Sequence, residues 1–220
     1  LFRSGNQAFW AGGAILAPFS QRIRGQLQPD GTVCTKILGN RVCLPTNWRG
    51  KNANSESCAI HGLILGMGVT SVETQSKPHS ATVSATLQAA DFDGHWPSRA
   101  NLTFHAAIQG DSFDLTVGAH NAGSDDLPIG LGWHPYWAFP SGDRSQVKLQ
   151  IPASQRVLLA DYQDCFPTGR LADVAGTPYD FTAPGGKALG GQYIEDCYVG
   201  LKTWQRGRGR AEIIDPAAHY

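Results

Sequence analysis

Two histidines combine a side chain suited to acid/base chemistry with unusual neighbours. His134 lies in GLGWHPYWAFP, where aromatic, proline and glycine residues surround it. His61 lies in AIHGLILG, just before Gly62, and glycine lets a ligand or another backbone come close. Imidazole has an unperturbed pKa of about 6.5, so a positioned histidine donates or accepts protons near neutral pH. The alternative for each residue is a structural histidine with no ligand.

The elements that must position these histidines are antiparallel strands. Apolar and polar residues alternate over residues 81–87, 101–108, 113–120 and 147–151, which is typical of half-buried strands. Turn signals such as QPDGT, IQGDS and PSGD separate such stretches, and no amphipathic helix of three turns is found. We therefore predict an all-β fold, a large antiparallel β-sandwich, built as a single domain over residues 1–220.

The charge and the hydropathy pattern limit the partners. The 18 basic and 18 acidic residues cancel, which disfavours a nucleic-acid or acidic-membrane partner, and no apolar stretch is long enough to span a membrane. Arg206, Arg208 and Arg210 alternate with glycines, which we interpret as a hairpin turn between two edge strands rather than a nucleic-acid-binding segment. We expect a small or neutral partner. We assign the chain to the cytoplasm, with the periplasm or secretion as alternatives.

The five cysteines form no CxxC pair, and their odd number argues against a complete disulfide framework. We therefore expect buried free thiols. A disulfide between Cys34 and Cys43, across a hairpin, is the alternative.

Several stretches, taken in order, resemble the aldose 1-epimerases (galactose mutarotases). They are GGAILAPFSQRI, AIHGL, NAGSDDLPIGLGWHPYWAF, DCFPTGRLADVAGTPYDF and YIEDCYVGL, and together they cover nearly the whole chain. HPYW combined with PTG…GTPYDF is a far more specific signal than any single motif. The resemblance implies a galactose mutarotase-like supersandwich with a sugar site on its concave face.

The resemblance also implies roles for the two histidines. His134 of HPYW matches the general acid that protonates the ring oxygen of a hexose. His61 of the His-Gly step matches the second histidine, which helps to hold that oxygen and to orient the sugar. The family's reaction interconverts α and β anomers by opening and reclosing the ring, and it requires no metal and no organic cofactor.

Four further residues are candidates for binding the substrate. Arg22 of SQRI matches the family's sugar-binding arginine, although Gln21 stands where the family has asparagine. Asp196 of EDCY matches the aspartate that accepts hydrogen bonds from ring hydroxyls. Tyr136 and Trp137 could stack on the apolar face of a pyranose, and Trp137 replaces the usual phenylalanine.

The family's catalytic base is a glutamate on a strand after an Asp-Pro turn, which Asp215-Pro216 matches here. Neither Glu195 nor Glu212 occupies that motif position. We therefore expect the sequence to be truncated at both ends, with the base beyond Tyr220.

The sequence thus predicts an isomerase, an aldose 1-epimerase that acts on free hexoses. Two alternatives remain, a non-catalytic carbohydrate-binding protein on the same fold and a hexose-6-phosphate 1-epimerase. The second would need an arginine cluster, for which Arg22, Arg24 and Arg41 are available. Neither the preferred sugar nor the oligomeric state follows from the sequence.

Overall fold

The computed structural model describes residues 12–203 and 207–219. Its regular structure is almost entirely antiparallel β-strand, which confirms the predicted all-β class, and the short 3₁₀ helix η2 (Pro216–Ala218) lies near the C-terminus. No helix in these ranges is long and apolar enough to cross a membrane. The chain divides into two compact units, Leu1–Gly50 with Glu56–Tyr136 and Lys51–Ser55 with Trp137–Tyr220.

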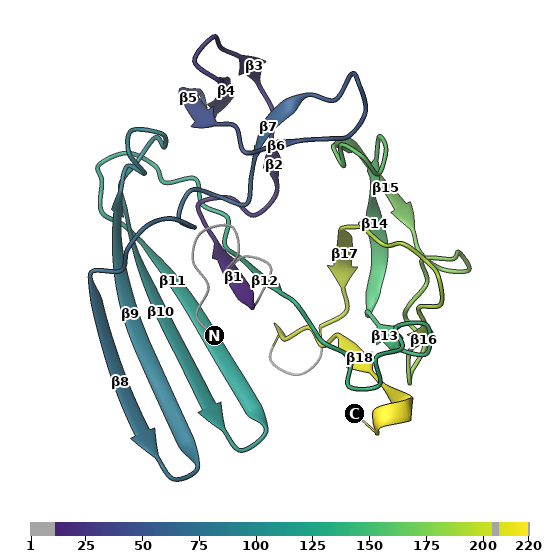
Figure 1. Cartoon of the computed structure of the whole chain (residues 1–220). Helices are drawn as coiled ribbons and strands as arrows, with labels where there is room; N and C mark the ends of the chain where they lie inside the picture. Colours follow the sequence, from purple (N-terminus) through teal and green to yellow (C-terminus); the bar gives the residue numbers. More distant parts are fainter. Residues whose placement is uncertain (1–11, 204–206, 220) are drawn as a thin grey trace. The chain divides into compact units, whose positions relative to one another are not determined.

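The first unit holds a long four-stranded sheet, a two-stranded sheet and two small three-stranded sheets (Figure 1). The four-stranded sheet is the meander β8 (Ser71–Lys77), β9 (Ser80–Ala90), β10 (Ala100–Gln109) and β11 (Ser112–Asn121). In the two-stranded sheet, β1 (Gly13–Leu16) pairs with β12 (Gly132–Pro135). The small sheets are β2–β7–β6 and β3–β4–β5, formed by β2 (Arg22–Ile23), β3 (Gln26–Leu27), β4 (Thr32–Ile37), β5 (Asn40–Pro45), β6 (Trp48–Arg49) and β7 (Ser57–Ile60).

The alternation in the sequence gives the long sheet one apolar face. Leu102 of β10 lies opposite Leu87 of β9, and Phe104 lies opposite Val117 of β11, so these side chains share a face. Leu87 and Leu102 are buried in a core cluster that packs against Phe104. Three of the predicted strands are thus confirmed as β9, β10 and β11. The same core also contains Ala17, Phe19, Val33, Leu44, Ala59, Ile64, Phe92 and Trp96.

The cysteine prediction is wrong for two residues, because Cys34 and Cys43 form a disulfide. They lie directly opposite each other in the β4–β5 hairpin, with their Cα atoms 4.1 Å apart. Leu38 and Gly39 form the two-residue turn with φ of 48° and 84°, which suits a tight hairpin. Cys58 and Cys165 are buried free thiols as expected, whereas Cys197 is exposed.

The second unit contains two three-stranded sheets with the strand orders β16–β13–β18 and β15–β14–β17. A smaller core of Val147, Phe181 and Leu189 packs against partly buried residues that include Leu149 and Tyr198, one from each of these sheets. The predicted strand at 147–151 is found as β13. The strands are β13 (Lys148–Gln150), β14 (Ala153–Leu159), β15 (Pro167–Asp173), β16 (Lys187–Ala188), β17 (Tyr198–Leu201) and β18 (Glu212–Ile214).

The predicted hairpin in the arginine-glycine segment is wrong. The strands that flank this segment, β17 and β18, belong to different sheets, because β17 pairs with β14 and β18 pairs with β13. Arg206 lies outside the described residues.

Candidate functional site

Strand β12 positions His134. It pairs with β1 in a register that sets His134 opposite Ala14 and Trp133 opposite Ile15. The pairing continues beyond the strands, since the Tyr136 N–H donates to the Gly12 carbonyl at 2.8 Å. A Cβ at Gly13 would overlap the indole of Trp133 in its observed position, so the glycine leaves room for that ring. The half-buried imidazole is therefore held on a rigid strand rather than on a loop.

His61 lies just past β7, where the backbone turns sharply. His61 and Gly62 both have positive φ, 66° and 79°. A Cβ at Gly62 would overlap the Ala17 carbonyl, which also accepts a hydrogen bond from Leu63 N–H at 2.7 Å. Of the two explanations that the sequence offered for this glycine, the close approach of another backbone is the one observed.

Asn47 and Ser20 fix the backbone before His61 and the His61 imidazole, respectively. Asn47 accepts from the Ile60 N–H at 2.8 Å and donates to the Ile60 carbonyl at 2.9 Å. The Ser20 carbonyl lies 3.1 Å from His61 Nδ1 and can only accept, so Nδ1 carries the hydrogen. A neutral His61 therefore presents Nε2 as an acceptor, and a protonated one presents it as a donor.

The fold brings the two predicted histidines together. The His61 and His134 ring centroids lie 5.1 Å apart with an interplanar angle of 71°, and the Tyr136 ring lies 5.3 Å from that of His134. Arg22 of β2 is paired with Ile60, and its guanidinium carbon lies 5.8 Å from the centroid of the Trp48 ring. The Arg22 Nε atom is buried without a hydrogen-bond partner among the described residues.

The predicted stacking aromatics are accessible to a ligand. Tyr136 is 42% exposed and Trp137 is 55% exposed, although each ring is large and apolar. Trp133 is also 42% exposed, and its ring lies 5.8 Å from that of Phe113. Exposed aromatic faces suit contact with the C–H face of a sugar. Tyr136 belongs to the first unit and Trp137 to the second.

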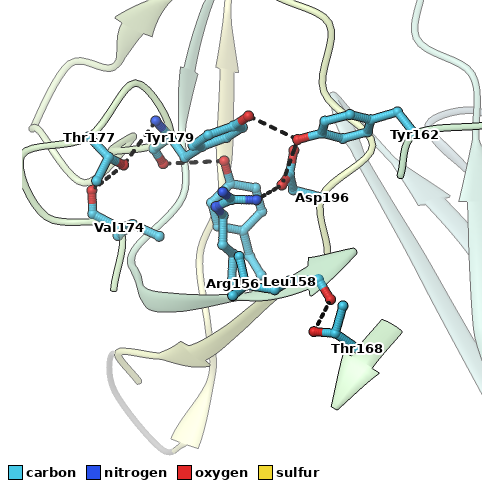
Figure 2. Close-up of polar contacts among 9 residues, drawn as sticks. Arg156, Leu158, Tyr162, Thr168, Val174, Thr177, Tyr179 and Asp196 are labelled. Carbon is cyan, nitrogen blue, oxygen red and sulfur yellow. Dashed lines mark hydrogen bonds and ion pairs between the residues drawn. The ribbon is translucent and has the colours of Figure 1, made fainter. Parts of the chain in front are cut away.

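Asp196, in the second unit, is surrounded by side chains that donate to it (Figure 2). Arg156 forms an ion pair with its Oδ1, and the Asp196 side chain is 0% exposed. The Tyr162 hydroxyl lies 3.1 and 3.0 Å from the two carboxylate oxygens and 2.9 Å from the hydroxyl of Tyr179. The Arg156 guanidinium stacks 3.7 Å from the centroid of the Tyr179 ring. In this arrangement, Tyr162 and Arg156 already donate to the carboxylate to which a sugar hydroxyl would donate.

The same cluster perturbs two phenols. Burial raises the pKa of Tyr162 well above its usual value, and hydrogen bonds to Tyr179 and Asp196 add to the effect. Burial also raises the pKa of Tyr198 to about 12, with a further contribution from the Asp196 charge that Arg156 partly offsets.

An alkaline titration of tyrosinate absorbance should detect these phenols. We expect Tyr162→Phe and Tyr198→Phe each to remove a step later than the ordinary one near pH 10. The pKa of each of these phenols is higher in the folded protein than in the unfolded one. The contribution of each protonated phenol to the free energy of unfolding is therefore complete below about pH 10, and it is lost as the pH rises through the folded-state pKa. The urea-unfolded protein is the control, in which every tyrosine should titrate together. A native titration with no late steps would contradict the prediction.

The other acidic residues that the sequence analysis named each have a partner of their own. Glu195 accepts from the Tyr193 hydroxyl at 2.7 Å, and Glu212 forms an exposed ion pair with Arg210 at 2.9 Å. Asp215 is buried and accepts from the Ser141 N–H at 2.9 Å, a hydrogen bond that lowers its pKa. Within residues 12–203 and 207–219, no group of three or more His, Cys, Asp or Glu side chains could hold a metal ion.

Several residues in these arrangements were not found from the sequence. Asn47 and Trp48 lie in a polar stretch without any motif, and Ser20 acts through its backbone. Arg156 and Tyr162 are separated from Asp196 by 40 and 34 residues, and no spacing rule links them.

Comparisons with known proteins agree with this architecture. A family model described as aldose 1-epimerase matches residues 4–220. The uncharacterized protein YphB from Escherichia coli (strain K12) is 27% identical over 192 residues, which is 84% of this chain and 57% of that protein. A galactose mutarotase-like protein from Clostridium acetobutylicum superposes with a TM-score of 0.71 at 19% identity, over 96% of this chain and 60% of that one. Galactose 1-epimerase from Lactobacillus acidophilus superposes with a TM-score of 0.57 at 18% identity, over 80% and 47% of the two chains. At these identities the structural matches establish the fold. The chain spans less than two thirds of the length of each of these proteins.

Proposed function

The chain belongs to the aldose 1-epimerase family. From that premise we propose that the protein is an isomerase that interconverts the α and β anomers of free hexoses. The observation that carries the proposal is the pairing of His61 and His134, with ring centroids 5.1 Å apart. Two imidazoles, one on β12 and one just past β7, beside the exposed ring of Tyr136, suit proton transfer to a neutral sugar.

The proposed reaction opens a cyclic hemiacetal. A base removes the proton from the C1 hydroxyl while His134 protonates the ring oxygen, so the C1–O5 bond breaks to give the open-chain aldehyde. Rotation about C1–C2 and reclosure in the reverse sense give the other anomer. His61, as an imidazolium with Nδ1–H on the Ser20 carbonyl, donates from Nε2 to the ring oxygen. As a neutral ring it instead accepts from a sugar hydroxyl.

Arg22 is the proposed hydroxyl-binding residue of the first unit, and Trp137 and Asp196 are the proposed sugar-binding residues of the second. For Asp196 the assignment has a structural condition. A sugar hydroxyl can reach this carboxylate only if Tyr162 gives up its hydrogen bonds to the two oxygens.

The base has no candidate at its motif position. Glu195 is bonded to Tyr193 and Glu212 is paired with Arg210. We therefore assign the base to neither of these glutamates. A site that has no base would belong to a carbohydrate-binding protein without catalysis, which is the alternative function.

Neutral hexoses are favoured over hexose 6-phosphates. Arg24 forms a surface ion pair with Glu56, and Arg41 lines a cavity beside Cys34. The described contacts of these two arginines thus lie with Glu56 and Cys34, and none of them links either arginine to Arg22 in a phosphate-binding cluster.

Anomer exchange tests the proposal. Polarimetry or saturation-transfer NMR would follow α-D-glucose and α-D-galactose with this chain, and with the natural gene product that contains it, against the rate in buffer. Acceleration by the natural product supports the epimerase. Sugar binding without acceleration by either protein would make the site a receptor and remove His134 from a catalytic role.

Arg22→Lys should weaken sugar binding without unfolding the protein. The substitution keeps the charge but removes the planar fork, including the buried Nε that has no partner within the described residues. Loss of a charged hydrogen bond is worth about 1.5–3 kcal/mol, so we expect Kd to rise about 10- to 100-fold. Isothermal titration with galactose and glucose measures it, and the exposed Arg24 changed to lysine is the matched control. Equal affinities for the two variants would exclude Arg22 from sugar binding.

A further inference from the structure

A cavity of about 480 Å³ lies in the first unit, and neither His61 nor His134 lines it. Its volume falls within the range of about 300–1,000 Å³ typical of small-molecule sites. The polar face of the β4–β5 hairpin and the turn that ends at His95 form its walls. Its lining includes Asp30, Cys34, Arg41, Cys43 and His95.

The disulfide is part of the cavity wall. On the opposite face of the hairpin, Val33 and Leu44 are 0% exposed and belong to the core. Because side chains alternate along a strand, Cys34 and Cys43 point away from that core. Both cysteines are half-buried and line the cavity. A small molecule in the cavity therefore meets the sulfur atoms without any unfolding of the hairpin.

An arginine lines the cavity, and a lysine lies beside that arginine on the hairpin. The Arg41 Nη2 atom lies 3.6 Å from the Cys34 Sγ. Lys36 lies directly opposite Arg41 in the register of β4 and β5 and is exposed. The acidic member, Asp30, already accepts hydrogen bonds from the Thr32 N–H at 2.9 Å and the Thr32 hydroxyl at 2.7 Å. Asp30 is thus held by its own turn, and Arg41, together with Lys36 beside it, supplies the positive charge that an anionic ligand would meet.

His95 supplies a further polar group. Its Nδ1 lies 2.6 Å from the Cys43 carbonyl, which only accepts, so Nδ1 carries the hydrogen. The contact ties the His95 ring to the backbone of Cys43, so its Nε2 is the atom that can contact a ligand in the cavity.

We propose that this cavity is a thiol–disulfide exchange site for a small thiol that carries carboxylate groups. The thiolate of the ligand attacks the Cys43 Sγ, forming a new S–S bond as the Cys34–Cys43 bond breaks. Cys34 leaves as a thiolate, and the electron pair of the broken bond stays on it. A second thiol can attack the mixed disulfide, which releases the oxidised small thiol and leaves Cys43 reduced.

The position of Arg41 sets the direction of the attack. A guanidinium beside a sulfur favours its thiolate form, and exchange is faster when the leaving thiol has the lower pKa. Arg41 contacts Cys34 rather than Cys43 among the described contacts. Cys34 is therefore the leaving group, and the ligand is retained on Cys43.

Mass spectrometry of the native protein tests the site and its direction. The chain is incubated with glutathione, with neutral 2-mercaptoethanol or with cationic cysteamine, quenched with an alkylating agent and digested. We expect the glutathione adduct on Cys43 and the alkyl group on Cys34. We also expect glutathione to react faster than the other thiols once each rate is divided by that thiol's rate with a small disulfide in solution.

Arg41→Gln should slow the glutathione reaction about tenfold and remove the preference for the anionic thiol. Lys77→Gln removes the same charge at the end of β8 and should react as the unchanged protein does. An adduct on Cys34, reaction only after unfolding in urea, or equal corrected rates for the three thiols would each overturn the proposal. No sugar enters this assay, so its outcome is independent of the proposed epimerase.

Discussion

His134→Ala is expected to lower the rate of enzyme-catalysed anomer exchange by at least about 10²-fold while the fold stays intact. A positioned general acid contributes about 10²–10⁴-fold, because it protonates the ring oxygen as the C1–O5 bond breaks. Alanine removes the proton donor but leaves the β1–β12 pairing, which is made by backbone groups around Ala14 and His134.

The measurement is kcat and KM for galactose and glucose, with the natural gene product that contains this chain. A lost general acid lowers kcat, whereas a lost binding residue chiefly raises KM. His61→Ala should show a mixture of the two effects, because His61 is assigned both to hold the ring oxygen and to orient the sugar.

A matched control is His105→Ala. His105 lies on β10, where its Nδ1 is 2.9 Å from the Ser84 hydroxyl, and it belongs to the polar face of the long sheet. Its removal should leave kcat unchanged. Full activity in His134→Ala would falsify the acid assignment, even if the family reaction were confirmed for the protein.

The strands were predictable because their signal is local. Alternation over about eight residues identified β9, β10 and β11, and the tight turns between them need only short-range chemistry. The contact between the two histidines is non-local. It depends on the pairing of β12 with β1 and on the pairing of β7 with β2, which follows β1 in the chain. Only the order of motifs along the chain suggested it.

Other features were not predictable because nothing local marks them. The Cys34–Cys43 disulfide depends on register, and an odd number of cysteines gave the wrong expectation for this pair. The two hydrogen bonds between the Asn47 side chain and the Ile60 backbone depend on the path of a polar loop. The motif that identified Asp196 says which residue is acidic, but it does not say which partners surround the carboxylate.

The ion pair between Arg156 and Asp196 is the basis of the second large expected effect, which is on stability. Arg156→Ala should lower the free energy of unfolding by about 3–5 kcal/mol, because it leaves the Asp196 carboxylate buried without its cation. The Asp196 side chain is 0% exposed and that of Arg156 is 17% exposed, so water cannot replace the guanidinium without a rearrangement.

Urea unfolding followed by far-ultraviolet circular dichroism measures the change. Arg210→Ala is the matched control, because it also breaks an arginine–carboxylate pair, with Glu212, but at 63% and 31% exposure. Exposed pairs contribute about 0–1 kcal/mol, so this variant should be nearly as stable as the unchanged protein.

The double variant Arg156→Met/Asp196→Leu separates the charge from the packing. Replacing a whole buried pair with apolar residues is often neutral, so the double variant should be more stable than Arg156→Ala. If Arg156→Ala costs no more than Arg210→Ala, water must reach Asp196, and a sugar hydroxyl could then reach it as well. A large cost would instead mean that Asp196 binds sugar only when Tyr162 and Arg156 rearrange. The free-energy cost of Arg156→Ala therefore shows whether a sugar hydroxyl can reach Asp196 in the free protein, or only after the ligand displaces Tyr162 and Arg156.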